Sequence, residues 1–162
     1  MLFKEAVSKL EESKEFKDWK KECDDSYLAH GFISFGDNSH WQIGYYNKKT
    51  DKITSFIMGP EIVVNAEENI FKEGHDEVKA LELDKIKINI DQALKAAEEL
   101  QQKEYTNDSV MKKIMIIQNI EQGQVWNVTF VTSTFKTLNI RVNAETGKIV
   151  EHKSNSIMDF KK

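Results

Sequence analysis

The stretch from residue 125 to residue 153 constrains the fold of this chain more than any other. In two runs, apolar residues alternate with polar ones: Trp126, Val128 and Phe130 in the first run, and Leu138, Ile140 and Val142 in the second. A period of two is typical of a strand with one buried face. Gly147 ends the turn that follows, because glycine takes a positive φ at no steric cost. The stretch therefore predicts an antiparallel sheet.

The N-terminal third of the chain is predicted to place a helix before further strands. Apolar residues at spacings of three and four predict a helix over residues 2–21, and Ser13 leaves open whether this is one helix or two. Strands are predicted over 27–35, 41–45 and 52–58, because turns rich in Asn, Asp and Gly separate these runs.

The second half contains the clearest helix signal. Its apolar stripe comprises Ile90, Ala93, Leu94, Ala97 and Leu100. Either Asn89 or Asp91 is predicted to cap this helix. An extended segment over 85–90 precedes it, and a strand over 110–120 follows it. Because the centre of that strand is apolar on both faces, we expect it to lie centrally in the sheet.

A short pattern occurs twice. Residues 47–53 align with residues 143–149, sharing Asn, Thr and Lys-Ile at the same offsets. Turn chemistry alone favours such residues, but each copy also follows a helix and a strand. We therefore predict an α+β protein of two helix-on-antiparallel-sheet repeats. Residues 1–60 would form a degenerate first repeat, 61–84 an acidic connector and 85–162 the second repeat.

Composition excludes several classes of protein. The net charge is −4, and Arg141 is the single arginine, so a dense basic stripe for nucleic acid is absent. No run approaches the roughly 18 apolar residues of a membrane span, and the N-terminus has no apolar signal region. We expect a cytoplasmic protein, with a secreted or anchored form open if the sequence was trimmed. Cys23 is the single cysteine, which excludes an intrachain disulfide and a thiolate metal cage.

Catalytic motifs are not found. The sequence has no glycine-rich phosphate loop and no His-Glu-x-x-His signature. His75 is the only histidine followed by two carboxylates, in His75-Asp76-Glu77, and it lacks the spaced partners of a zinc site. Acidic neighbours of Cys23 disfavour its thiolate. We therefore expect no catalytic residues, no metal and no cofactor, and a protein that is not an enzyme.

Two segments resemble PepSY-type domains. Residues 88–97 resemble the family's strand-to-helix junction with its acid-x-Ala-x-x-x-Ala pattern, and residues 126–149 resemble its closing strands with an Asn-Ala-x-Thr-Gly hairpin. The match covers about residues 84–152, whereas 41–56 resembles the family more loosely because Asp51 replaces the glycine. The resemblance implies a cystatin-like helix on a curved sheet and a non-catalytic role in inhibiting or regulating peptidases. The family has no catalytic set to carry over.

Four aromatic residues are candidates for a binding surface: Trp41, Tyr45, Trp126 and Phe130. If they occupy equivalent places in two repeats, they line a shared groove as anchors for a partner. The alternative is that they belong to the core beneath the helices. We expect an interaction module that binds a peptide segment or a protein partner. The alternative is a small-molecule-binding or enzymatic pocket between helix and curved sheet.

Overall fold

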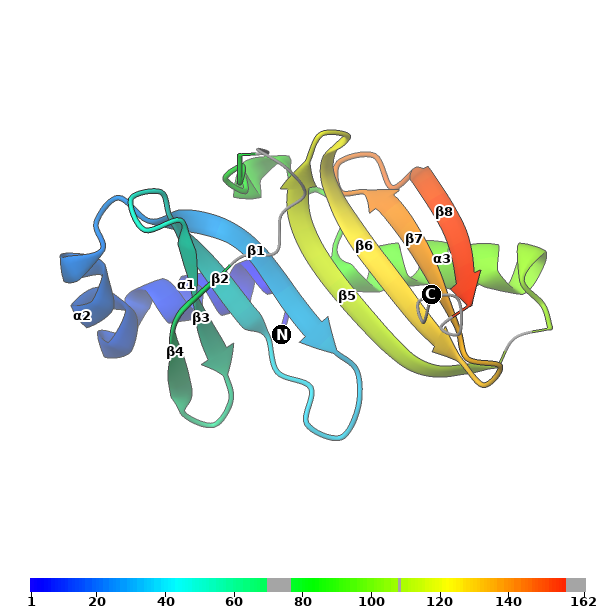
Figure 1. Cartoon of the computed structure of the whole chain (residues 1–162), viewed down its shortest axis with the longest axis horizontal. Helices are drawn as coiled ribbons and strands as arrows, with labels where there is room; N and C mark the ends of the chain where they lie inside the picture. The colour runs from blue at the N-terminus through cyan, green and yellow to red at the C-terminus, as the bar shows by residue number, and fades with distance from the viewer. Residues whose placement is uncertain (70–76, 108, 157–162) are drawn as a thin grey trace.

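The computed structural model describes residues 1–69, 77–107 and 109–156, which form one antiparallel sheet with helices against one of its faces (Figure 1). The strand order is β4-β3-β2-β1-β5-β6-β7-β8. The strands are β1 (Tyr27–Ser34), β2 (Gln42–Asn47), β3 (Lys52–Met58), β4 (Ile62–Asn69), β5 (Val110–Ile120), β6 (Gly123–Thr132), β7 (Lys136–Asn143) and β8 (Ile149–Ser156). The helices are α1 (Phe3–Glu12), α2 (Lys14–Glu22), α3 (Ile90–Glu104) and the short 3-10 helix η1 (Leu83–Lys85).

This continuous sheet contradicts the prediction of two helix-on-sheet repeats. β1 pairs with β2 on one side and with β5 on the other, where the register runs from His30 opposite Gln118 to Ser34 opposite Ile114. The strands that we predicted to form two sheets are therefore hydrogen-bonded into one. The broader assignment to the α+β class holds, since three α-helices accompany eight strands in the described residues.

Local turn chemistry explains the repeated pattern on which that prediction rested. Asp51 and Gly147 both take a positive φ, of 54° and 78°, at the ends of the β2–β3 and β7–β8 turns. The Asn47 and Asn143 side chains both accept backbone N–H groups within their turns. Such turns select the same few residue types wherever they occur, so a shared pattern does not show which strands pair.

Capping side chains set where α2 and α3 begin. Ser13 accepts a hydrogen bond from the Phe16 N–H at 3.2 Å, so α1 and α2 are two helices that meet at this residue. Asn89 begins α3, and its side chain and that of Gln92 each accept the other residue's N–H at 2.9 Å. Of the two residues that the sequence offered as the cap of α3, Asn89 and Asp91, the structure shows Asn89.

A single apolar core joins all three α-helices to the sheet. The Phe3 ring lies 5.1 Å from the Trp41 ring and 6.4 Å from the Trp126 ring, which connects the two halves of the chain. α1 approaches β1 closely because Gly31 has no side chain: a Cβ there would lie 2.2 Å from a Phe3 ring carbon. In Figure 1, α1 and α3 pass behind the strands, and the opposite sheet face carries no described helix.

The stretch predicted as an acidic connector, residues 61–84, contains regular structure. The edge strand β4 occupies Ile62–Asn69, and η1 occupies Leu83–Lys85, at the start of the segment predicted to be extended. Residues 70–76 lie outside the described part of the chain. β5 lies fifth among the eight strands, so its predicted central position is confirmed.

Candidate functional site

The four aromatic residues predicted as binding candidates lie in the core. Trp41 and Tyr45 are each 3% exposed, Trp126 is 1% exposed and Phe130 is 0% exposed. The structure does bring Trp41 and Trp126 together, with ring centroids 6.2 Å apart. All four belong to the core cluster, in which Trp41 packs on Phe3 of α1 and Tyr45 packs on Phe16 and Trp19 of α2.

The polar atoms of these aromatic residues are used inside the fold. Trp126 Nε1 donates to the Ile88 carbonyl at 2.8 Å, and Trp41 Nε1 donates to the Met1 carbonyl at 3.0 Å. The Tyr45 hydroxyl donates to the Glu11 carboxylate at 3.0 Å, and burial together with that carboxylate raises the pKa of Tyr45. Buried donors with partners of this kind are typical of structural aromatic residues.

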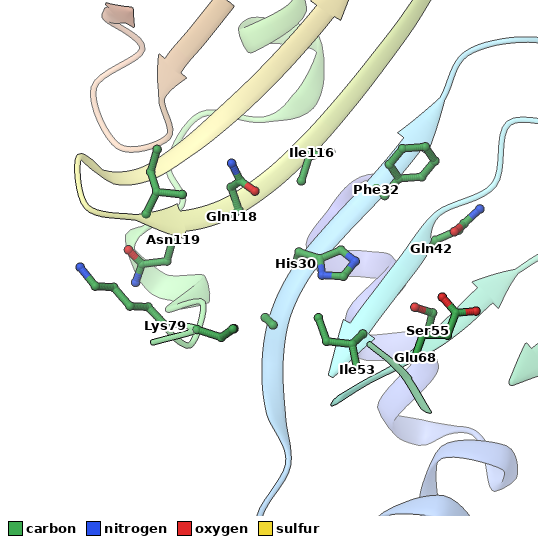
Figure 2. Close-up of a pocket in the computed structure, with 13 residues that line it drawn as sticks. His30, Phe32, Gln42, Ile53, Ser55, Glu68, Lys79, Ile116, Gln118 and Asn119 are labelled. Atoms are coloured by element: carbon green, nitrogen blue, oxygen red, sulfur yellow. The ribbon is translucent and has the colours of Figure 1, made fainter. Parts of the chain in front are cut away.

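A hollow of about 480 Å³ lies on the helix-free face of the sheet, where β1 meets β5. Six residues make its floor and sides: His30, Phe32, Gln42, Ser55, Ile116 and Gln118. Figure 2 shows that they come from β1, β2, β3 and β5 and share one face. The volume falls within the roughly 300–1,000 Å³ usual for binding pockets.

Strand register explains why these side chains converge. Residues directly opposite one another on neighbouring strands point to the same face of a sheet. One row crosses three strands through Gly44, His30 and Gln118. The next row contains Gln42, Phe32 and Ile116. The floor is therefore a polar row beside a mainly apolar row.

A bulge and a glycine place the His30 ring. The β1–β2 register shifts between Leu28 and His30, so Leu28 packs in the core while His30 points to the helix-free face. The ring lies over Gly44, since a Cβ at that position would be 2.2 Å from His30 Cε1. Any larger residue at position 44 would occupy the space of the imidazole.

The segment before η1 forms one wall of the hollow. The Tyr27 hydroxyl donates to the Val78 carbonyl, and Asn119 Nδ2 donates to the Ala80 carbonyl at 3.0 Å. The Leu81 N–H donates to the Leu28 carbonyl at 2.9 Å. These bonds fix the wall to β1 and β5 and hold Lys79 at the edge of the hollow.

The electrostatics of the site favour neutral hydrogen bonding. Burial lowers the pKa of His30 below its ordinary value of 6.5, so the ring is neutral at pH 7 and carries one donor and one acceptor nitrogen. The side chains of His30, Gln42 and Gln118 form no hydrogen bond with any described residue. Glu68 from β4 and Lys79 line opposite sides (Figure 2).

The arrangement lacks the geometry of an activated serine. Ser55, His30 and Glu68 all line the hollow, but no hydrogen bond joins any two of these described side chains. A nucleophile needs its base within hydrogen-bond reach, and the base needs an orienting partner. The chemistry that the hollow offers is recognition of a group with both donor and acceptor atoms beside an apolar one.

A second depression of about 540 Å³ lies beside the β3–β4 turn. Its charged residues, Lys9, Glu15 and Glu61, are exposed. No strand register directs these side chains toward a common point. We therefore place the candidate site in the hollow between β1 and β5.

Sequence reasoning missed the hollow because its residues lie on the face that strand alternation marks as outward. One signal was present: Phe32 and Ile116 are apolar at outward positions, and they become neighbours only through the β1–β5 pairing. Nothing in the sequence pattern indicates that pairing.

The fold and the hollow define an α+β protein whose eight-stranded sheet is covered on one face and open on the other. No protein-family profile matches the sequence, and no curated protein sequence matches it. The crystal structure of a putative lipoprotein from Clostridium difficile has a similar fold, with a TM-score of 0.60 and 11% sequence identity. The alignment covers 87% of this chain and 90% of that one. At this identity, the likeness concerns the fold alone.

In the described part of the chain, no three His, Cys, Asp or Glu residues gather closely enough to hold a metal ion. His75 and Asp76, from the histidine-carboxylate cluster seen in the sequence, lie outside the described residues. No described helix has both the length and the apolar composition to cross a membrane.

Proposed function

We propose that this chain is a non-enzymatic interaction module that binds an extended peptide segment of a partner protein in the hollow between β1 and β5. The observation that carries the proposal is the convergence of His30, Gln42 and Gln118, without partners among the described residues, beside the apolar Phe32 and Ile116. Polar groups placed in this way around an apolar floor provide orientation and specificity in a binding site.

A peptide fits both halves of this chemistry. Its backbone amides carry one donor and one acceptor each, which neutral imidazole and carboxamide groups can match. An apolar side chain seated against Phe32 and Ile116 would gain up to about 1.5–3 kcal/mol from burial. Glu68 and Lys79, on opposite sides of the hollow, favour a segment with a basic residue toward β4 and an acidic one toward the wall.

A small molecule is the second candidate, because the volume of the hollow suits one. The location differs from the predicted pocket between helix and sheet. That space holds the core side chains, among them Ala93, Ala97, Trp126 and Phe130, which are all at most 1% exposed. A ligand without peptide character that binds the hollow in place of every peptide would favour this second candidate.

Selection from a random peptide library displayed on phage tests the proposal. Bound phage are selected on the purified protein and then counter-selected on Ile116→Lys, which puts a charged chain in the floor of the hollow. Thr137→Lys is the matched control, because Thr137 lies on the same face two strands away, on β7. Circular dichroism verifies that both variants fold.

The proposal predicts enriched peptides that share an apolar residue and bind with micromolar Kd in calorimetry. Ile116→Lys should weaken this binding at least about tenfold, which corresponds to 1.4 kcal/mol, and Thr137→Lys should leave it unchanged. If no peptide is enriched, or if both variants bind every enriched peptide equally well, the hollow is not a peptide site.

The nature of the partner and the cellular location belong to the same proposal. The resemblance of residues 88–97 and 126–149 to PepSY-type domains supports a peptidase as the partner that supplies the segment. The location predicted from the sequence is cytoplasmic, whereas the fold of the lipoprotein neighbour supports an anchored or secreted form. Fractionation of source cells distinguishes the two, since the anchored form sediments with membranes.

A further inference from the structure

Two polar residues of the hollow, His30 and Gln118, lie close enough to contact a single ligand group. His30 on β1 and Gln118 on β5 are directly opposite one another across the strand pair. Directly opposite residues in an antiparallel pair have Cβ atoms roughly 4.5–5.5 Å apart. Figure 2 shows both side chains on the hollow side of their strands. Neither has a hydrogen-bond partner within the described residues.

The position of the His30 ring is restricted by its neighbours. The imidazole lies against Gly44 on β2, so close that a Cβ there would be 2.2 Å from Cε1 and 2.6 Å from Nδ1. The bulge at Leu28 and His30 sets the direction in which the side chain leaves β1. A ring held in this way meets a ligand with little loss of side-chain entropy.

The charged and titratable groups around His30 come from three neighbouring elements. β4 contributes Glu68, and the wall before η1 contributes Lys79. On β2, Tyr46 lies on the same face in the neighbouring row, and its hydroxyl is bonded to Asp51 at 2.5 Å. β3 and β5 face the ring with uncharged residues, which in the described part of the chain are Ile53, Ser55, Ile116, Gln118 and Asn119.

We propose that His30 and Gln118 together bind one backbone amide of the peptide that the proposed function places in the hollow. The unprotonated imidazole nitrogen accepts the ligand N–H, and the Gln118 carboxamide donates to the ligand carbonyl. The inference rests on the proposed function and specifies its ligand: a segment with a free secondary amide next to its apolar anchor. Protonation of His30 turns the accepting nitrogen into a donor and removes the first bond.

The pH dependence of peptide binding tests whether His30 accepts the ligand N–H. Burial keeps the pKa of free His30 below 6.5, so the Kd of a selected peptide should stay constant above that pH. At lower pH the Kd should rise toward about tenfold per pH unit, since the neutral ring must be regained before binding. His30→Gln keeps a neutral acceptor at every pH, so its Kd should stay flat. Glu68→Gln and Lys79→Gln should retain the wild-type slope.

Methylation of the ligand backbone provides a second readout. Peptides N-methylated at one position at a time lose one N–H each. At one position, next to the apolar anchor, methylation should weaken binding to the wild type about tenfold. The same methylation should have little effect on His30→Ala, because that variant has no ring to accept the bond.

The results separate this inference from the function on which it rests. A peptide that depends on Ile116 but binds His30→Gln with the wild-type pH slope, or that tolerates every N-methylation, overturns the amide assignment and leaves the peptide site standing. Failure to select any Ile116-dependent peptide overturns both. If His30→Gln does not fold, His30→Asn serves as the second neutral variant.

Discussion

Gly44→Ala tests the packing that places His30 in the floor of the hollow. The new Cβ would lie 2.2 Å from His30 Cε1, whereas ordinary contacts between such atoms begin near 3.4 Å. The ring must therefore move by more than about 1 Å, and it has one open side, toward the hollow. Overpacking of this kind costs about 1–3 kcal/mol, and we expect the lower part of that range because the ring can turn outward.

A double-mutant cycle isolates this contact. In the His30→Ala background the clash is gone, so Gly44→Ala should cost nothing or stabilise by about 0.4–1 kcal/mol through the unfolded chain. The expected coupling between the two positions is about 1–3 kcal/mol. Gly36→Ala is the matched control. Neither glycine takes a positive φ, and a Cβ at Gly36 has no neighbour within 4 Å.

Urea unfolding monitored by circular dichroism supplies the free energies for the cycle. Binding of the selected peptide supplies a functional readout. The displaced ring fills part of the hollow, so the Kd of the peptide for Gly44→Ala should rise at least about fivefold. Equal stability changes for Gly44→Ala in the two backgrounds would refute the reasoning, since His30 would then not be the group that the new methyl meets.

The remaining predictions concern the core, the caps and pH. Trp126→Ala should lower the free energy of unfolding by roughly 3–5 kcal/mol, because it opens a cavity and leaves the Ile88 carbonyl without its donor. Asn127→Ala should cost only about 1 kcal/mol through its lost bond to Asn139. If urea melts show a larger loss of stability for Asn127→Ala than for Trp126→Ala, the assignment of Trp126 to the buried face of the sheet is wrong. Asn89→Ala should cost about 1 kcal/mol by removing the cap of α3, and an unchanged melting temperature would contradict that role. The folded pKa of His30 lies below its unfolded value of 6.5. The unfolded chain therefore binds more protons at acidic pH, and the stability that neutral His30 contributes above pH 6.5 is lost as pH falls through the folded pKa. The melting temperatures of wild type and His30→Gln, measured between pH 7.5 and 5, should diverge below about pH 6.5. Parallel pH dependences would show that the pKa of His30 is not lowered by folding.

The elements of the fold were predicted well because local signals specify them. The helix stripe on α3 needs only side-chain periodicity. Ser13 left open whether one helix or two precede β1, and the structure shows two. The two faces of β6 were predictable from Trp126, Val128 and Phe130, which alternate without interruption and are buried. Each of these features depends on residues within a few positions of one another.

The arrangement of the strands could not be predicted, because pairing depends on contacts far apart in the chain. His30 and Gln118 pair although they lie 88 residues apart in the sequence (118 − 30), and no local feature marks them as neighbours. The repeated turn pattern favoured two sheets for a local reason, the left-handed positions at Asp51 and Gly147. The hollow was hidden for the same reason, since it exists only where β1 and β5 meet.

The segment that follows η1 shows a different limit of prediction from sequence. Ile86 and Ile88 alternate as a strand would, yet they follow η1 without joining the sheet and pack against the core instead. Two backbone N–H groups of this segment share one acceptor, since those of Lys87 and Ile88 both donate to the Ala144 carbonyl at 2.9 Å. Period-two alternation reports burial on one side, which an irregular segment can also supply.

A methyl NMR titration with a selected peptide tests the central claim most directly, because it reports where the ligand lies. With isoleucine methyl groups labelled, Ile53, Ile116 and Ile120 report on the hollow, Ile43 on the helix-covered core and Ile149 on the β8 edge. We predict saturable shifts at Ile53, Ile116 and Ile120, with Ile43 and Ile149 nearly unchanged. Shifts confined to Ile149, or to core methyls beneath the helices, would contradict a binding site on the helix-free face.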